Sequence, residues 1–264
     1  MKIFLLALLL AVTISSIESL IWVGDFANFA SWPIGNPYLT ENREIVNDPK
    51  GSGQKVLKVK YPAGSYSSLP GNKGGTGFFV WPFGTNIIQH ATLEFEVLFP
   101  ADWDWVKGGK LPGLFGGRTS CSGGDMALDC FSTRFMFGPN GGGYAYLYVS
   151  KVANHSAEFC ALTTAPNCSP DWGYGIGGSK YFDKDRWIKI KQLVKLNTPG
   201  RQDGRLTIWV DNVQKFDFAK MVYRTGTVPI SGIAFETFFG GNTADWATPK
   251  TVYSYFRNFR IETF

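Results

Sequence analysis

The sequence predicts an all-β fold, a jelly-roll β-sandwich that forms a single domain. Three observations support this prediction. Strong helix formers are sparse, whereas Gly (31), Phe (22), Tyr (11) and Trp (9) are abundant, a composition that suits pleated surfaces and tight turns. Several segments alternate apolar and polar residues with a period of two. Gly and Pro punctuate the rest of the chain, which contains no fixed-period repeat and no low-complexity linker.

The chain begins with the pattern of a signal peptide. A positive charge at Lys2 precedes an apolar run over residues 3–14, and small serines follow up to Ser19. The alternative is a buried first strand or helix; a membrane span would need ~20 apolar residues. We expect residues 1–19 to be removed on export. Residues 20–264 then form one secreted, extracellular domain, since β-sandwiches often reach ~200–250 residues.

Eight segments are predicted to be strands. Six of them alternate with one solvent-exposed face, over residues 56–61, 92–99, 187–196, 206–210, 213–218 and 252–261. Asp211 and Asn212 separate two of these segments and predict a tight hairpin, because both residue types tolerate a positive φ. Two further strands, about 130–137 and 144–150, flank a Gly-Pro-Asn-Gly-Gly-Gly turn.

The net charge favours an anionic partner. The chain carries 26 basic and 21 acidic residues, a formal charge of +5. Lys and Arg are not clustered, and an exported protein is kept away from nucleic acid, so we expect neither nucleic acid nor a membrane as partner. An anionic polysaccharide fits both charge and location. We expect no cofactor, and a monomer.

Four cysteines in an exported chain indicate two disulfides, for which three pairings exist. We predict the local pairs Cys121–Cys130 and Cys160–Cys168, each worth roughly 2.5–3 kcal/mol on the chain-entropy model. The alternative is a metal site. We discount it because the spacings are not those of zinc ligands and both histidines lie far away in the sequence.

Two Asn-x-Ser sequons flank the second cysteine pair, at Asn154 and Asn167. In an exported protein they predict a surface loop that is open to glycosylation. Asn167 is the weaker acceptor, because Cys168 stands in the middle of its sequon.

The strands 130–137 and 144–150 carry the side chains that are best suited to binding or catalysis. On a strand, alternate residues share a face, so Ser132 lies on the same side as Arg134. The same rule puts three phenols on one face of the second strand: Tyr144, Tyr146 and Tyr148. These tyrosines by themselves are typical of cross-strand aromatic packing.

The length of the turn decides which of these residues meet. If the turn is centred on Asn140, Arg134 lies opposite Tyr146; if it is centred on Gly141, Arg134 lies opposite Tyr148. In both cases a guanidinium faces a row of phenols. An arginine among phenylalanines must be solvated or paired with a carboxylate.

The local sequence offers Arg134 two acidic partners, Asp125 and Asp129. A carboxylate on a bound ligand would serve the same purpose.

Several motifs resemble a known family. They are KGGKLPGL at residues 107–114, the Ser-x-Arg of Ser132 and Arg134, YLY at 146–148, and TFFGG, WATPK and YSYFRNF near the C-terminus. Together they resemble the alginate lyases of polysaccharide lyase family fourteen, known from marine gastropods and algal viruses, with glucuronan lyases as jelly-roll relatives. The family pattern of a lysine, a serine, an arginine and two tyrosines falls on Lys110, Ser132, Arg134, Tyr146 and Tyr148.

The resemblance implies a secreted endo-type lyase that cleaves alginate, preferring mannuronate, by β-elimination without a cofactor. This reaction removes the C5 proton beside a carboxylate and expels the C4 oxygen. Arg134 would neutralise the carboxylate as the enolate forms. Tyr146 and Tyr148 would serve as base and acid, and we expect Lys110 and Arg134 to lower the pKa of these phenols. Lys110 would share the base role or hold the substrate, and Ser132 would orient the substrate.

Other residues complete the expected site. Lys107 and Tyr144 would bind substrate, and four tryptophans are candidates either for sugar stacking or for the core: Trp103, Trp105, Trp172 and Trp246. Asp102 and Asp104 have the spacing of a glycosidase pair, but a solvated loop is the simpler interpretation.

Two alternatives remain open. The same arginine and tyrosine chemistry suits another polyuronate such as glucuronan. A non-catalytic, lectin-like module is the other, because jelly rolls host binding and catalysis alike.

Overall fold

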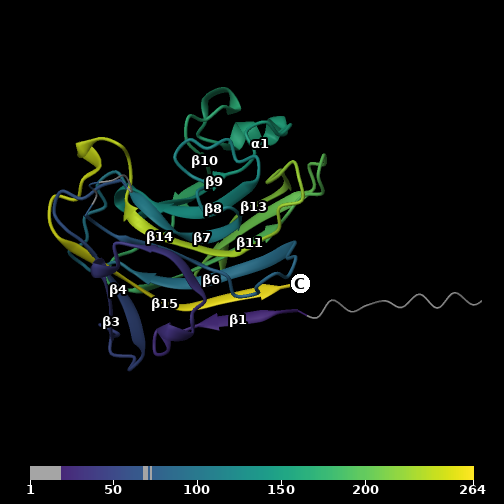
Figure 1. Cartoon of the computed structure of the whole chain (residues 1–264). Helices are drawn as coiled ribbons and strands as arrows, with labels where there is room; N and C mark the ends of the chain where they lie inside the picture. Colours follow the sequence, from purple (N-terminus) through teal and green to yellow (C-terminus); the bar gives the residue numbers. More distant parts are fainter. Residues whose placement is uncertain (1–18, 68–70, 72) are drawn as a thin grey trace, which may run out of the picture.

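The computed structural model describes residues 19–67, 71 and 73–264, which form two antiparallel β-sheets packed face to face (Figure 1). This confirms the predicted all-β sandwich. The expected signal peptide lies outside the described residues, Ser19 excepted. Within the described ranges, no helix is both long and apolar enough to cross a bilayer.

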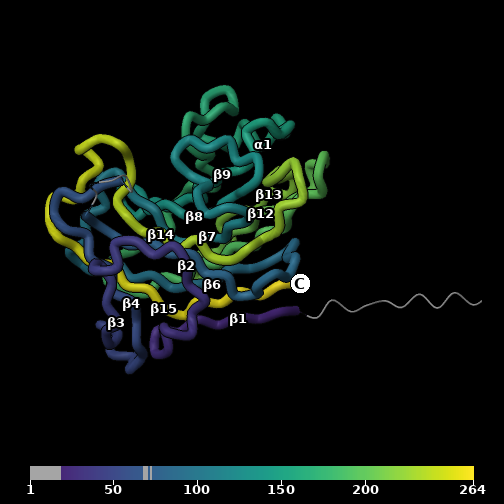
Figure 2. The backbone as a smooth tube through the Cα atoms, in the orientation of Figure 1, coloured from purple at the N-terminus to yellow at the C-terminus, as the bar shows by residue number. Residues whose placement is uncertain are grey.

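The first sheet has eight strands. Seven follow one another in the order β13 (Val213–Met221), β12 (Gly204–Val210), β11 (Trp187–Lys195), β6 (His90–Leu98), β15 (Val252–Thr263), β4 (Lys55–Tyr61) and β3 (Arg43–Asn47). The eighth strand, β1 (Ile21–Gly24), pairs with the C-terminal part of β15, as the tube view also shows (Figure 2).

The second sheet has seven strands and carries the candidate site. Their order is β10 (Tyr174–Lys180), β9 (Gly142–Tyr148), β8 (Cys130–Phe137), β7 (Gly109–Gly117), β14 (Gly232–Phe239), β5 (Thr76–Val80) and β2 (Ile34–Tyr38). The paired strands of both sheets are antiparallel, so short turns suffice to join β8 to β9 and β12 to β13.

All eight predicted strands are present, with ends that differ by at most three residues. Asp211 and Asn212 have φ values of 50° and 65°, which confirms the predicted hairpin. Seven strands of the described residues were not predicted from the sequence. Among them β5 is buried at every residue and β14 at all but one, so neither shows the alternation that reveals a strand with one wet face.

Aromatic side chains fill the space between the sheets. Phe95 and Phe259 stack with their ring centroids 5.2 Å apart, and Trp103 stacks on Phe239 at 5.2 Å. Trp103 and Trp105 therefore belong to the core, where each large side chain contributes roughly 1.5–3 kcal/mol.

The segment that joins β9 to β10 projects beyond the second sheet and contains the helix α1 (Ala157–Leu162) (Figure 1). The sequence analysis did not predict this helix. Ser156 caps it by accepting a hydrogen bond from the Phe159 amide at 3.1 Å. His155, which a sequon places on the surface, is only half exposed because it stacks on Phe159.

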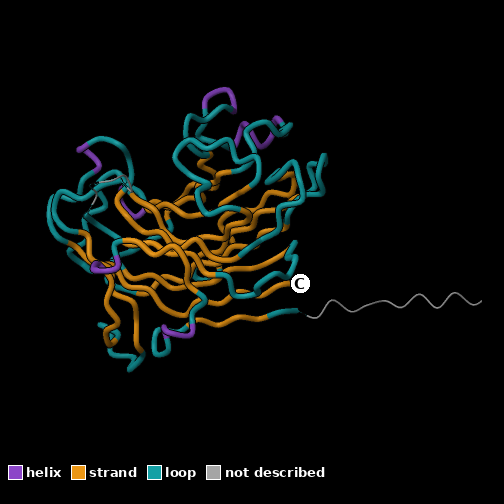
Figure 3. The backbone as a smooth tube through the Cα atoms, viewed as in Figure 1, coloured by secondary structure: helices purple, strands orange, loops and turns teal. Residues whose placement is uncertain are grey.

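Five 3-10 turns complete the secondary structure of the described residues (Figure 3): η1 (Phe29–Ser31), η2 (Thr40–Asn42), η3 (Pro139–Gly141), η4 (Pro166–Cys168) and η5 (Ala244–Trp246). Both predicted disulfides are present, Cys121–Cys130 between β7 and β8 and Cys160–Cys168 between β9 and β10. Asp102 and Asp104 lie in the loop that follows β6, as expected for solvated residues.

Candidate active site

The turn between β8 and β9 sets the register of the site. Asn140 lies at the centre of η3 in the left-handed region, at φ 57° and ψ 23°. Arg134 consequently pairs with Tyr146, and Ser132 with Tyr148. The first of the two predicted registers is therefore correct.

A cavity of about 370 Å³ opens over β7, β8 and β9 on the face turned away from the core. Its wall includes residues from all three strands: Lys110, Arg134, Met136, Tyr144, Tyr146 and Tyr148. Register explains why they meet, because Lys110 pairs with Met136, which in turn pairs with Tyr144. The structure thus brings together four of the predicted catalytic residues and Tyr144.

Lys110 lies in direct contact with the phenols. Its Nζ is 3.6 Å from the centroid of the Tyr146 ring and 2.8 Å from the Met136 sulfur. Burial, with the nearby positive charge of Arg134 as the second cause, lowers the pKa of the Lys110 ammonium well below its usual value. Lys110 is therefore suited to lose its proton and act as a base.

Arg134 forms an ion pair with Glu236 of β14. The Arg134 side chain is 2% exposed and that of Glu236 13%, so the pair is nearly removed from solvent. The Tyr38 hydroxyl of β2 donates to the other carboxylate oxygen at 3.1 Å. The Arg134 Nε and Nη2 atoms have no hydrogen-bond partner among the described residues. Two donors of the guanidinium thus remain for a ligand.

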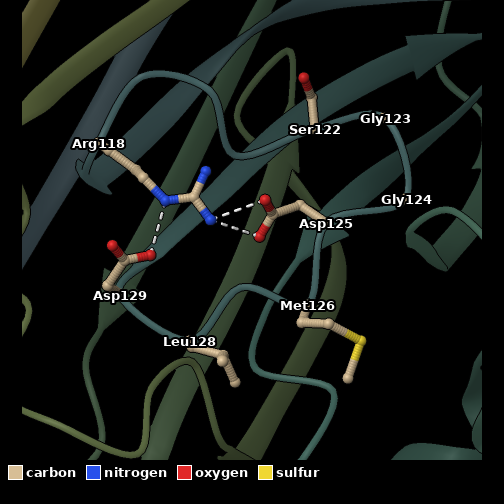
Figure 4. Close-up of a pocket in the computed structure, with 8 residues that line it drawn as sticks. All are labelled: Arg118, Ser122, Gly123, Gly124, Asp125, Met126, Leu128 and Asp129. Atoms are coloured by element: carbon tan, nitrogen blue, oxygen red, sulfur yellow. Dashed lines mark hydrogen bonds and ion pairs between the residues drawn. The ribbon is translucent and has the colours of Figure 1, made fainter.

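The partner of Arg134 is not one that the sequence analysis considered. Asp125 and Asp129 were the expected acidic neighbours, yet both bind Arg118, at 2.7 Å each (Figure 4). Glu236 is 102 residues from Arg134 and reaches it only because β14 and β8 both pair with β7.

Gly113 makes room for this arginine. It pairs with Arg134 across β7 and β8, next to a bulge after Leu111. A Cβ atom at Gly113 would overlap the backbone of Thr133 and Arg134. The glycine therefore permits the close approach of the two strands below the cavity.

The two central tyrosines accept backbone hydrogen bonds. The Gly173 amide donates to the Tyr146 hydroxyl at 3.1 Å, and the Gly124 amide donates to the Tyr148 hydroxyl at 3.3 Å. The two rings meet edge to face, 5.8 Å apart. Each phenol oxygen is therefore fixed by a donor that favours a negative charge on it.

The expected lowering of the phenol pKa by Lys110 and Arg134 is wrong for Tyr146. Burial raises the pKa of the Tyr146 phenol, and the neighbouring Tyr148 raises it further. Burial also raises the pKa of the Tyr144 phenol. The physical reason is that desolvation of the phenolate outweighs the attraction of cations whose charge is itself buried or paired. Tyr146 is therefore held in its protonated form.

Ser132 and Lys107 lie outside the cavity wall. Ser132 is buried and its hydroxyl donates to the Cys121 carbonyl at 3.4 Å, so it contacts the disulfide loop and not the cavity. Lys107 is half exposed, forms an ion pair with Asp245 and lies 5.9 Å from the ring of Trp246. Lys107 is not among the residues that line the cavity, whereas Trp246 is.

Two tryptophans flank the cavity. Trp172, at the end of the β9–β10 linker, is 49% exposed, and Trp246 belongs to η5 between β14 and β15. Both line the cavity, unlike the buried Trp103 and Trp105. The tertiary structure thus separates the two kinds of tryptophan that the sequence left undecided.

Among the residues that the structure describes, one group of three potential metal ligands lies together, Cys121, Asp125 and Cys130. The disulfide between the two cysteines consumes both thiolates, and Arg118 binds the carboxylate. This group does not have the chemistry of a metal site.

Comparison with known proteins identifies the family. The profile of the polysaccharide lyase 14 family matches residues 49–259. This range includes β7, β8 and β9, the three strands under the cavity. The chain belongs to polysaccharide lyase family 14.

Solved structures of the family agree with this assignment. A family 14 alginate lyase from the marine animal Aplysia kurodai is 31% identical, with a TM-score of 0.77 over 88% of this chain and 91% of that one. The alginate lyase vAL-1 from Chlorella virus is 26% identical, with a TM-score of 0.74 over 90% of this chain and 95% of that one.

A curated relative is considerably longer. The exolysin of Paramecium bursaria Chlorella virus 1 is 27% identical over 199 residues, which are 67% of this chain but 30% of the viral protein. The present chain therefore spans less than a third of that relative's length.

Sequence reasoning missed three residues of the site. Glu236 gave no signal, because its partner is distant in the chain. Met136, two residues after Arg134 on the same strand, was given no role, although it contacts the Lys110 amine. Tyr38, on the edge strand β2, became relevant only through its bond to Glu236.

Proposed function

We propose that this polysaccharide lyase cleaves alginate by β-elimination, with a preference for mannuronate. The observation that carries the proposal is the position of the Lys110 amine, 3.6 Å from the Tyr146 ring in a cavity that Arg134 also lines, with two guanidinium nitrogens that have no hydrogen-bond partner among the described residues. Two structural relatives that match nearly the whole chain are alginate lyases.

Arg134 binds the uronate carboxylate in this proposal. Its Nε and Nη2 form one edge of the guanidinium, and a carboxylate accepts two hydrogen bonds from such an edge. Neutralising the carboxylate makes the C5 proton acidic and stabilises the enolate-like charge of the transition state. Glu236 holds the opposite side of the guanidinium, through Nη1.

Lys110 is the base. With its pKa lowered by burial, the amine carries a lone pair that takes the C5 proton. Two electrons of the C5–H bond then form the C4=C5 double bond as the C4–O bond breaks.

Tyr146 is the acid. Its raised pKa keeps the phenol protonated, and the phenol gives its proton to the departing C4 oxygen. The Gly173 amide stabilises the phenolate that remains. Tyr148 and Tyr144 extend the phenol row along β9 and hold the sugar rings.

The mannuronate preference follows from the side of the ring on which the base and acid lie. In mannuronate the C5 proton and the C4 oxygen are on the same side of the ring. Lys110 and Tyr146 are in contact and lie on one wall, which suits removal of the proton and protonation of the leaving oxygen from a single side.

Export is part of the proposal and is supported by the N-terminal sequence pattern and the two disulfides, which form in oxidising compartments. Expression in a secreting host, followed by N-terminal sequencing of the protein in the medium, tests it. A mature chain that still begins at Met1 would contradict it.

The test of the activity uses three substrates: polymannuronate, polyguluronate and glucuronan. The unsaturated product absorbs in the ultraviolet, so its formation is followed directly. We expect the fastest rise with polymannuronate. A rise with glucuronan alone would replace alginate by glucuronan as substrate. Binding without any rise would make the protein a lectin-like module.

A further inference from the structure

Two loops supply the amides that donate to the tyrosine hydroxyls. Gly124 lies in the loop closed by Cys121–Cys130, and Gly173 ends the linker from β9 to β10. These loops are 49 positions apart in the numbering, yet their amides bind neighbouring phenols, Tyr148 and Tyr146.

Lys151 ties the two loops together. Its Nζ donates to the Gly124 carbonyl at 3.0 Å and to the Asp171 carbonyl at 3.2 Å. Its backbone amide also donates to the Met126 carbonyl at 3.0 Å. One ammonium group thus contacts the residue that donates to Tyr148 and the segment that donates to Tyr146.

The first loop has a second anchor, Arg118. Its guanidinium binds the carboxylates of Asp125 and Asp129 (Figure 4). Lys151 acts on the residue next to Asp125, at Gly124, whose amide donates to the Tyr148 hydroxyl.

The amide positions matter for the chemistry. A phenol that gives up its proton becomes an anion, and a fixed N–H donor stabilises that anion as it forms. Such a donor is effective only if it is held in place before the reaction, since reorienting a loop costs free energy during the step.

We propose that Lys151 is a positioning residue for the lyase reaction, which holds the Gly173 and Gly124 amides against the Tyr146 and Tyr148 hydroxyls. This inference rests on the proposed function, because it assumes that Tyr146 transfers a proton. Lys151 does not line the cavity and has no contact with substrate in this assignment.

The test compares three variants on polymannuronate. Lys151→Met removes the ammonium and keeps an unbranched apolar stem. Lys151→Arg restores donors that reach both carbonyls. The matched control is Lys220→Met, because Lys220 binds Glu158 in the same linker but on an exposed surface.

We expect Lys151→Met to lower kcat by about 10- to 100-fold with KM changed less than about threefold, since the amides act on the transition state. Lys151→Arg should recover kcat to within about threefold of the wild type, and Lys220→Met should leave it unchanged. An unchanged kcat in Lys151→Met, or no recovery in Lys151→Arg, overturns the inference.

A second background separates positioning from a purely structural role. If Lys151 acts through Tyr146, adding Lys151→Met to Tyr146→Phe should lower the remaining rate less than about twofold, because the hydroxyl is already absent. A loss as large as in the wild-type background means that the lysine only supports the loops and overturns the proposal. Absence of lyase activity in the wild type refutes the proposed function instead.

Discussion

Arg134 on β8 and Glu236 on β14 form an ion pair beneath the cavity, although β7 separates their strands. The pair leaves one edge of the guanidinium without a protein partner among the described residues. Glu236 therefore does two things: it compensates a buried charge, and it fixes the guanidinium through Nη1.

Glu236→Gln should destabilise the protein by about 3 kcal/mol, because it leaves the Arg134 charge buried without its counter-ion. Urea unfolding followed by circular dichroism measures this change. Glu44→Gln is the control, since Glu44 pairs with Lys58 at an exposed position and should cost less than about 0.5 kcal/mol. Equal losses in the free energy of unfolding for the two substitutions would show that the buried ion pair stabilises the fold no more than the exposed one.

Arg134→Lys should lower kcat by roughly 10- to 100-fold while KM changes less than about threefold. Lysine keeps the charge beside Glu236 but loses the planar edge that binds a carboxylate twice, and this interaction strengthens as the enolate forms. Steady-state kinetics on polymannuronate separates the two constants. A raised KM with normal kcat would assign Arg134 to ground-state binding alone.

Tyr146→Phe should lower turnover by ~10²–10⁴, because the phenol no longer supplies a proton to the leaving oxygen. The ring and its contact with Lys110 are kept, so the circular dichroism spectrum should not change. Tyr144→Phe is the matched control on the same strand and should retain most of the rate. If Tyr146→Phe turns over normally while Tyr148→Phe does not, the acid is Tyr148.

The rate should rise with pH through the lowered pKa of Lys110. Below that pKa the amine is protonated and cannot accept the C5 proton; above it the amine is neutral and active. The rising limb of kcat/KM should therefore lie below the ordinary lysine value of ~10.4. Lys110→Arg, which stays protonated throughout, should be inactive at every pH. A limb at the ordinary lysine value would remove Lys110 from the base role.

Trp172→Ala should raise KM by about fivefold, corresponding to about 1 kcal/mol of lost ring stacking, with kcat nearly unchanged. Trp172 is 49% exposed and lines the cavity. It lies in the linker before β10, whereas Lys110 is on β7. Trp209→Ala, on the other sheet, is the control and should leave KM unaltered. A fall in kcat with constant KM would contradict a binding role for Trp172.

Most of the strands that the sequence predicted have one partly exposed face; β8, which is buried at every residue, was predicted from the glycine-rich turn that follows it. β6 and β11 alternate buried and half-buried residues along most of their length, which produces the period of two. β5 and β14 are covered on both faces and lack this period, so their place in the sheet could not be predicted.

The features of the site also fall into those that the sequence predicted and those that only the tertiary structure shows. Arg134 and Tyr146 lie on adjacent strands joined by a short turn, so their pairing followed from the turn length and one register choice. The protonation of Tyr146 did not follow, because burial depends on every element packed around the cavity.

By itself, the sequence determined what depends on neighbours along the chain. The disulfides close short local loops, the hairpin at Asp211 needs two residues that tolerate positive φ, and alternation marks the half-exposed strands. Only the tertiary structure decided the ion pair of Arg134 with Glu236 and the bridge that Lys151 makes between two loops. These contacts join residues from strands or loops that become neighbours through sheet order, which a local pattern of residues does not encode.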